Sequence, residues 1–380
     1  MPASSPYLLT PGPLTTSAAT KEAMLRDWGS RDPEFIALNR RVRECLVEIA
    51  GGDGSHVAVP LQGSGTFSVE AMLATFVPRE GKLLILVNGA YGRRMALMCK
   101  YSGRAHAVYE TPEDTPPDLG EVDHLLARDP AISHVAMVHC ETTSGILNPV
   151  AEAADLVARR GRRFLIDGMS AFGALPLDAR QVPFDALAAS ANKCLEGVPG
   201  MGFVVARAGA LAACAGNANA LSLDLHDQWQ AMDKNGQWRF TPPTHVIAAF
   251  ACALEQHKAE GGVAGRGARY RKNCAILIEG LRALGFETLL PDRLQAPIIV
   301  TVHTPADRRF QFDRFYDSLS RRGYVIYPGK LTVADTFRIG CIGALGESEM
   351  RGVLEAIRST LAEFGVTHCG RATPPRAANA

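Results

Sequence analysis

The sequence predicts an α/β fold: a large, mostly parallel and doubly wound sheet domain, followed by a smaller α+β domain. From about residue 57 to residue 206, short apolar runs alternate with stretches of helical periodicity. Each run is bounded by Gly, Pro or polar residues, which is typical of buried parallel strands. The chain has 380 residues, enough for two to three domain-sized units. Strands that alternate with helices favour a parallel sheet with helices on both faces.

The later part of the chain has a different pattern. A glycine-rich stretch near residue 262 is a plausible junction, and short strands and helices in mixed order follow it. The final residues are rich in Ala, Pro and Arg, which indicates a disordered tail. We therefore expect an N-terminal segment (1–16), a large domain (17–262), a small domain (263–366) and a tail (367–380).

Residues 216–241 have little periodicity. They hold two of the three tryptophans, Trp229 and Trp238. Such aromatic residues predict an ordered loop over a site or a subunit interface.

Composition excludes several classes of function. The 40 basic and 39 acidic side chains leave a net charge of +1, which argues against a general nucleic-acid-binding role. The nine cysteines are scattered without zinc-like spacing, so we expect free thiols in a reducing compartment and no metal site. The chain shows no secretory signal, and no apolar run approaches the ~20 residues of a membrane span. These features predict a cytoplasmic protein that has no membrane partner.

An acid and a lysine follow two neighbouring apolar runs. The run from Phe164 to Ile166 ends in Asp167, and the run from Phe184 to Ala189 is followed by Lys193. Catalytic groups collect at the carboxyl ends of parallel strands. This pair suits pyridoxal phosphate (PLP), because a lysine can form a Schiff base with its aldehyde and an acid can keep its ring nitrogen protonated. The alternative is a surface lysine and a helix-capping aspartate.

Two further strand ends carry candidate binding groups. The strand Val57–Leu61 leads into Gly63-Ser64-Gly65-Thr66 and then a helix, an arrangement that offers N–H groups to a phosphate. This turn is neither a Walker A loop nor GxGxxG, and an ordinary helix cap is its alternative. Tyr91 follows the strand Leu83–Val87 and is placed to stack on an aromatic cofactor, or it is an ordinary buried tyrosine.

Taken together and in order, these motifs resemble the class V aminotransferases of PLP fold type I over about residues 7 to 365. The resemblance rests on Thr10-Pro11-Gly12-Pro13, Gly63-Ser64-Gly65-Thr66, Asn88-Gly89-Ala90-Tyr91-Gly92, Glu141-Thr142-Thr143-Ser144-Gly145, Asp167 and Lys193. Four further stretches resemble the branch of this family that moves the amino group of 2-aminoethylphosphonate to pyruvate. They are residues 190–194, 224–229, 237–245 and 335–340.

The resemblance implies a set of residue roles. Lys193 would hold PLP and move the proton, and Asp167 would pair with the pyridine nitrogen. Ser64, Gly65 and Thr66 would bind the cofactor phosphate.

The resemblance implies further contacts around the cofactor ring and the substrate. Thr142 would touch the hydroxyl side of the ring, and Tyr91 would stack on its face, where alanine–glyoxylate relatives carry tryptophan. Asn192 stands where those relatives use glutamine near the phosphate. Arg338 would bind the acidic end of the substrate. The resemblance also implies a homodimer, in which Thr241 or Thr244 would reach the phosphate of the neighbouring subunit's cofactor.

The function implied is therefore transfer of an amino group between two small molecules, 2-aminoethylphosphonate and pyruvate, with PLP as cofactor. The main alternative is an alanine–glyoxylate or serine–pyruvate aminotransferase, which would use the same residues. PLP-dependent lyases share this fold as well. A regulator or binding module without catalysis would be favoured by loss of the lysine, and Lys193 is present.

Overall fold

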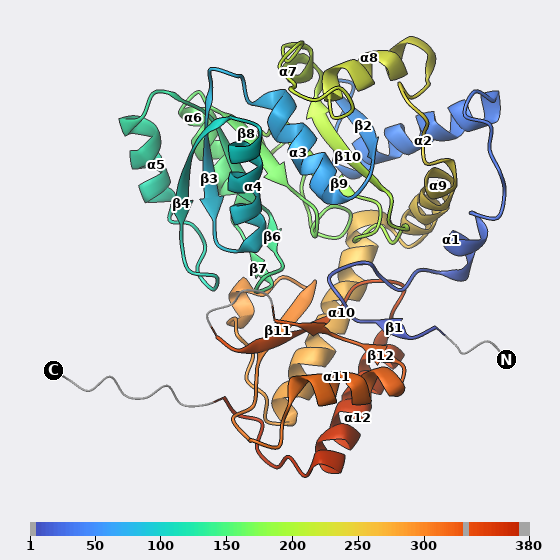
Figure 1. Cartoon of the computed structure of the whole chain (residues 1–380), viewed down its shortest axis with the longest axis vertical. Helices are drawn as coiled ribbons and strands as arrows, with labels where there is room; N and C mark the ends of the chain where they lie inside the picture. The colour runs from blue at the N-terminus through green and yellow to red at the C-terminus, as the bar shows by residue number, and fades with distance from the viewer. Residues whose placement is uncertain (1–4, 330–333, 372–380) are drawn as a thin grey trace.

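A seven-stranded sheet forms the centre of the larger part of the molecule (Figure 1). The structure is a computed structural model that describes residues 5–329 and 334–371. The strands lie in the order β2-β10-β9-β8-β5-β3-β4. Their bounds are His56–Gln62 (β2), Lys82–Val87 (β3), Ala105–Glu110 (β4), Ile132–Val138 (β5), Arg163–Asp167 (β8), Ala186–Ser190 (β9) and Met201–Arg207 (β10).

The sheet is mostly parallel, as predicted. Only β10 reverses the direction, because it is antiparallel to both of its neighbours, β2 and β9. The strands β8 and β9 are parallel and adjacent, and Asp167 at the end of β8 pairs with Ala188 of β9. The acid and the chain that leaves β9 toward Lys193 therefore reach the same edge of the sheet.

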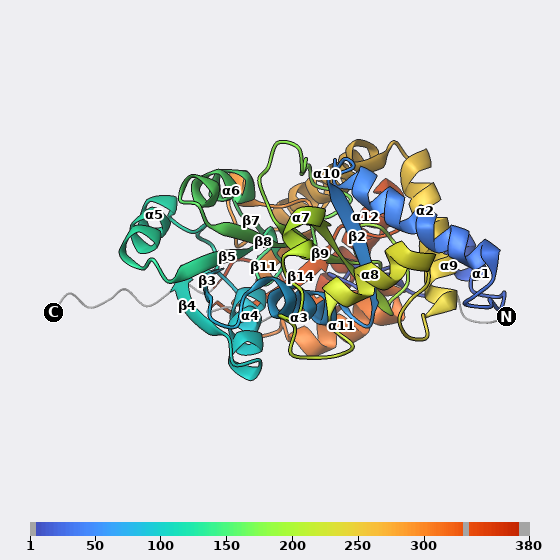
Figure 2. The ribbon, with the colours of Figure 1, turned by 90° about the horizontal axis from the view of Figure 1, so that it is seen from above.

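Helices cover both faces of this sheet, which confirms the doubly wound architecture. Figure 2 shows α5 and α6 on the side of the sheet opposite to α3 and α4. Two separate apolar clusters fill the two interfaces. One face carries α2 (Pro33–Ile49), α5 (Leu119–Arg128), α6 (Val150–Arg159) and α9 (Thr244–Ala259), and the other carries α3 (Gly65–Phe76), α4 (Ala90–Tyr101), α7 (Ala208–Ala212) and α8 (Leu225–Asn235).

A smaller α+β unit lies below the large sheet in Figure 1 and has its own apolar core. Its antiparallel sheet has the order β11-β14-β13. The long helix α10 connects the two units. The bounds here are α10 (Gly262–Ala283), β11 (Ile299–His303), α11 (Phe312–Arg321), β13 (Tyr327–Pro328), β14 (Thr336–Gly340) and α12 (Glu347–Phe364).

The two ends of the described chain both pack on the small unit. Near the N-terminus, β1 (Tyr7–Leu8) pairs in parallel with β12 (Tyr324–Val325). Of the tail expected from residue 367, the structure describes the first five residues: Cys369 is buried in the small core, and Arg371 forms an ion pair with Glu287 at 3.0 Å. Residues 372–380 lie outside the described part of the chain.

Two stretches differ from the sequence-based expectation. The segment 216–241 contains the helix α8, which Asp224 caps by accepting the backbone N–H of Asp227 at 3.0 Å. The helix α10 runs through the glycine-rich junction. A Cβ on Gly267 would lie 2.4 Å from the carbonyl oxygen of Ala174, so this glycine allows close packing and does not break the helix.

The first helix, α1 (Ala18–Glu22), begins after Ser17, whose Oγ accepts the backbone N–H of Thr20 at 3.1 Å. Within residues 5–329 and 334–371, no helix has the length and apolar character that crossing a bilayer requires.

Candidate active site

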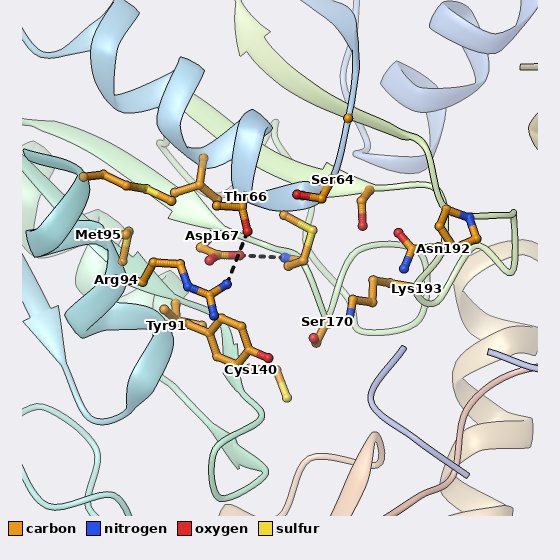
Figure 3. A pocket seen from close by; sticks show the side chains of 18 of the residues that line it. Ser64, Thr66, Tyr91, Arg94, Met95, Cys140, Asp167, Ser170, Asn192 and Lys193 are labelled. Atoms are coloured by element: carbon orange, nitrogen blue, oxygen red, sulfur yellow. Dashed lines mark hydrogen bonds between the residues drawn. The ribbon is translucent and has the colours of Figure 1, made fainter. Parts of the chain in front are cut away.

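The turn between β2 and α3 presents two hydroxyls and the start of a helix to a cavity (Figure 3). Ser64 is the N-cap of α3 and has an extended backbone, with φ −83° and ψ 169°. Ser64, Gly65 and Thr66 all line the cavity. A Cβ on Gly65 would lie 2.2 Å from Sδ of Met169, so a larger residue there would displace the methionine side chain. Because the first N–H groups of a helix have no partner within it, this turn can hold an anion.

The strand β8 carries a buried carboxylate, Asp167, into the same cavity. The side chain is 4% exposed, and its Oδ1 accepts the backbone N–H of Met169 at 3.0 Å. Burial raises the pKa of Asp167 to about 6; the Met169 hydrogen bond and the charges of Lys193 and Arg94 work against that rise. A cation placed against this carboxylate would favour its ionised form.

Lys193 lies three residues beyond β9, and the N-terminal segment contacts its side chain. Its Nζ donates to the carbonyl oxygen of Pro11 at 2.5 Å. Gly12 has φ +118°, and a Cβ built on it would lie 2.6 Å from the same Nζ. Any side chain at residue 12 would therefore displace the lysine.

Tyr91 and Arg94 enter the cavity from the first turns of α4 (Figure 3). The guanidinium carbon of Arg94 lies 4.9 Å from the centre of the Tyr91 ring. Its Nη1 donates to Oγ1 of Thr66 at 3.3 Å, which joins α4 to the turn before α3.

The cavity has a volume of about 400 Å³, within the usual range for small-molecule sites. Seven of the residues proposed from the sequence line it: Ser64, Gly65, Thr66, Tyr91, Asp167, Asn192 and Lys193. They come from four separate strand ends, as expected for a site at the edge of a parallel sheet.

Arg338 and Thr142 lie together, outside the residues that line the cavity. Arg338 on β14 is 1% exposed, and its Nη1 donates to the carbonyl oxygen of Thr142 at 2.7 Å. Burial lowers the pKa of Arg338, and Tyr91, Tyr327 and Glu141 oppose the shift. Among the described residues, no acidic side chain forms an ion pair with this guanidinium. The Oγ1 of Thr142 is also buried and has no hydrogen-bond partner among the described residues.

Thr241 and Thr244 are not among the residues that line this chain's own cavity. Thr241 is exposed, and Thr244 is the half-buried first residue of α9. The nearby Val246 packs against the cavity wall: its Cγ2 would lie 3.0 Å from a Cβ built on Gly200, which is a lining residue.

Three functional candidates were missed by the sequence reasoning. Arg94 and Ser190 line the cavity, and the Oγ of Ser190 has no partner among the described residues. Glu141 is fully buried, and its Oε2 accepts the backbone N–H groups of Tyr91 at 3.1 Å and Gly92 at 3.3 Å. Ser190 carried a sequence signal, because it directly follows the run from Phe184 to Ala189, and Glu141 stood in one of the motifs that support the family resemblance. From the sequence, Arg94 could equally well have faced solvent. The contacts of Glu141 join residues about 50 positions apart, which a local pattern does not reveal.

Comparisons with known proteins agree on one group. Residues 24–317 match the model of the family described as "Aminotransferase class-V". A 2-aminoethylphosphonate–pyruvate transaminase of Pseudomonas putida is 56% identical over 95% of this chain and 98% of its own length. An enzyme of the same name from Cupriavidus taiwanensis is 56% identical over 96% of this chain and 97% of its own.

Solved structures with the same fold are more distant in sequence. The ureidoglycine–glyoxylate aminotransferase of Bacillus subtilis superposes with a TM-score of 0.88 at 22% identity, over 96% of this chain and 95% of that one. The alanine–glyoxylate aminotransferase of Nostoc gives a TM-score of 0.88 at 23% identity, over 95% and 96%. At these identities the likeness concerns the fold alone.

Proposed function

Because this chain belongs to the class V aminotransferases, we propose that it uses PLP to transfer the amino group of 2-aminoethylphosphonate to pyruvate, giving phosphonoacetaldehyde and L-alanine. The observation that carries the choice of substrate is the 56% identity, over nearly the whole chain, to two enzymes of that name. The geometry of the cavity supports the cofactor.

The residues present fit PLP. The turn before α3 offers N–H groups and the hydroxyls of Ser64 and Thr66 for a phosphate. Asp167 offers a buried acid for a ring nitrogen, and the unpartnered Oγ of Ser190 leaves a hydrogen-bonding group free in the cavity wall. A buried polar atom without a partner is costly, so a polar ligand here would stabilise the protein.

The side chains would then divide the work. When bound, PLP supplies an electron sink for the carbon that carries the amino group. Asp167 would stay ionised beside the ring nitrogen, since a paired cation counteracts the effect of its burial. Lys193 would hold the aldehyde and, once released as a neutral amine, accept and return the substrate proton. Tyr91 would lie on the ring face, Thr142 on the hydroxyl side of the ring and Asn192 near the phosphate.

Arg338 would bind the acidic end of each substrate. Its guanidinium is buried and has no carboxylate partner among the described residues, so an anionic ligand would relieve an uncompensated charge. A planar guanidinium binds either a phosphonate or a carboxylate through two hydrogen bonds. One arginine can therefore serve both the amino donor and the oxoacid.

The nine cysteines are free, which agrees with a reducing cytoplasmic location.

A comparison of amino donors tests this function. With pyruvate as acceptor, we expect 2-aminoethylphosphonate to give the highest kcat/KM for L-alanine formation, ahead of serine. Alanine would be tested with glyoxylate as the amino acceptor, and the glycine that forms would be measured. A higher kcat/KM for alanine with glyoxylate, or for serine with pyruvate, would favour the alternative aminotransferases.

We also propose a homodimer in which Thr241 or Thr244 binds the cofactor phosphate of the other subunit. Neither threonine lines this chain's own cavity, which supports a role for one of them at a second one. The chain mass is 40.7 kDa, and sedimentation should give twice that value. A fully active monomer would contradict the proposal.

Mixing of subunits tests the shared site directly. Lys193→Ala removes the lysine, and the double variant Thr241→Val/Thr244→Val removes both hydroxyls. A hybrid dimer of the two variants would contain one site with both defects and one intact site. We therefore expect activity to rise when the two are refolded together. No gain above the separate variants would mean that each subunit completes its own site, and the single threonine variants identify the residue involved.

A further inference from the structure

The loop that follows Lys193 contains a strained residue. Among the described residues other than glycine, Glu196 alone has φ in the left-handed region, at +57°. Its backbone N–H donates to the carbonyl oxygen of Lys193 at 2.8 Å, so the strained residue closes a turn that begins at the lysine. A left-handed conformation strains a residue other than glycine, and it persists only where its surroundings hold it.

Buried charged groups on α10 hold this turn. The Oε1 of Glu196, a 7% exposed residue, accepts Tyr270 Oη at 2.5 Å and Arg269 Nη2 at 2.8 Å. Arg266 Nη1 lies 3.4 Å from the same oxygen, and it donates to the carbonyl oxygen of Cys194 at 2.5 Å. The residue after the lysine and the end of its turn are therefore both fixed from one helix.

The side chains of this network are balanced in charge. Glu260 pairs with Arg266 at 2.6 Å and with Arg269 at 2.7 Å, so two carboxylates face two guanidinium groups. Burial and the negative charge of Glu196 hold the pKa of Tyr270 well above its usual range, so the phenol stays protonated and donates.

We infer that Glu196 is a positioning residue for Lys193: its carboxylate, held by Arg266, Arg269 and Tyr270, fixes the turn that aims the lysine amine into the cavity. Glycine would adopt φ +57° without strain, yet a glutamate stands there. Its side-chain bonds must therefore outweigh the backbone cost, and among the described residues these bonds go to Arg266, Arg269 and Tyr270 alone. The inference rests on the proposed function, because it concerns the use of Lys193.

The test measures how fast PLP attaches to the full chain after its cofactor has been removed. In that reaction the lysine nitrogen bonds to the aldehyde carbon and the oxygen leaves as water, and the visible absorbance reports the rate. Removing a nearby carboxylate lowers the pKa of a lysine, so its electrostatic effect alone would speed attachment. Misplacement by about 1 Å slows a reaction by on the order of 100-fold. The two effects have opposite signs.

For Glu196→Gln we expect attachment and kcat to fall by about 10- to 100-fold, with KM for pyruvate within about twofold. The matched control is Glu260→Gln, which removes the other carboxylate of the network but does not touch the lysine turn. Both variants should unfold at a lower temperature, because each leaves one carboxylate to face two guanidinium groups. Only Glu196→Gln should slow attachment.

Unchanged or faster attachment in Glu196→Gln, or an equal slowing in Glu260→Gln, would overturn the inference. If Glu196→Gln does not fold, Tyr270→Phe replaces it, because it removes one bond to Glu196 without changing a charge; normal attachment in that variant would also overturn the inference. The unmutated chain separates the two proposals. If it fails to attach PLP at Lys193, the proposed function itself is wrong.

Discussion

Replacement of Lys193 by alanine is expected to abolish transamination. The variant lacks both the amine that holds the cofactor and the group that moves the substrate proton. Proton transfer by a positioned side chain alone is worth about 10²–10⁴-fold in rate. We therefore expect L-alanine formation from 2-aminoethylphosphonate and pyruvate to fall by at least that factor.

The same variant has a second, chemical readout. The unmutated protein should be yellow, and borohydride should bleach the colour and fix the cofactor to the peptide that contains Lys193. Lys193→Ala should show no such label. Lys272→Ala is the matched control, because Lys272 is an exposed lysine paired with Glu347 on the small unit. Near-normal turnover in Lys193→Ala would overturn the assignment of the site.

Replacement of Arg338 by alanine is expected to weaken both half-reactions. Loss of a charge-assisted pair at a desolvated site costs about 2–5 kcal/mol, which corresponds to about 30- to 5,000-fold in affinity. We expect kcat/KM to fall by about this factor for 2-aminoethylphosphonate and for pyruvate. Arg338→Lys keeps the charge but loses the two parallel hydrogen bonds, so it should restore only part of the loss.

Because Arg338 also bonds backbone carbonyls, a purely structural effect needs a control. Arg104 is similarly buried at 5% exposure, and it donates to the carbonyl oxygens of Ala74 and Asn217. Arg104→Ala should lower the unfolding temperature without changing KM for either substrate. If Arg338→Ala leaves both kcat/KM values within about twofold, the arginine is structural. If the pyruvate value alone falls, the site is one for carboxylates, and the alanine–glyoxylate alternative gains.

Local patterns were enough to predict much of this molecule. Strand ends and helix starts can be recognised from local residue patterns. The end of an apolar run therefore located Asp167, and a strand followed by a small-residue turn and a helix located Ser64 to Thr66. The helix α8 was missed for the opposite reason. It buries few side chains, and its clearest signals are its caps, Asp224 and the left-handed Gly236.

Contacts between distant residues were beyond such reasoning. Glu141 reaches the start of α4 from another strand end, and Glu196 is held by a helix about 70 residues later. A carboxylate in a loop has the same appearance in the sequence whether it faces water or a buried arginine. Only the fold brings these partners together, so their roles followed from the structure and not from the motifs.

The position of the N-terminal segment has a consequence for biosynthesis. Tyr7 and Leu8 pair with β12, the carbonyl of Leu9 accepts the N–H of Gly340, and Pro11 touches the amine of Lys193. A ribosome makes these residues long before it makes their partners in the small unit. The large sheet can form during translation, but the N-terminal segment cannot take its place beside Lys193 until residue 340 has emerged. The candidate active site is therefore completed late, by residues that were made long before their partners.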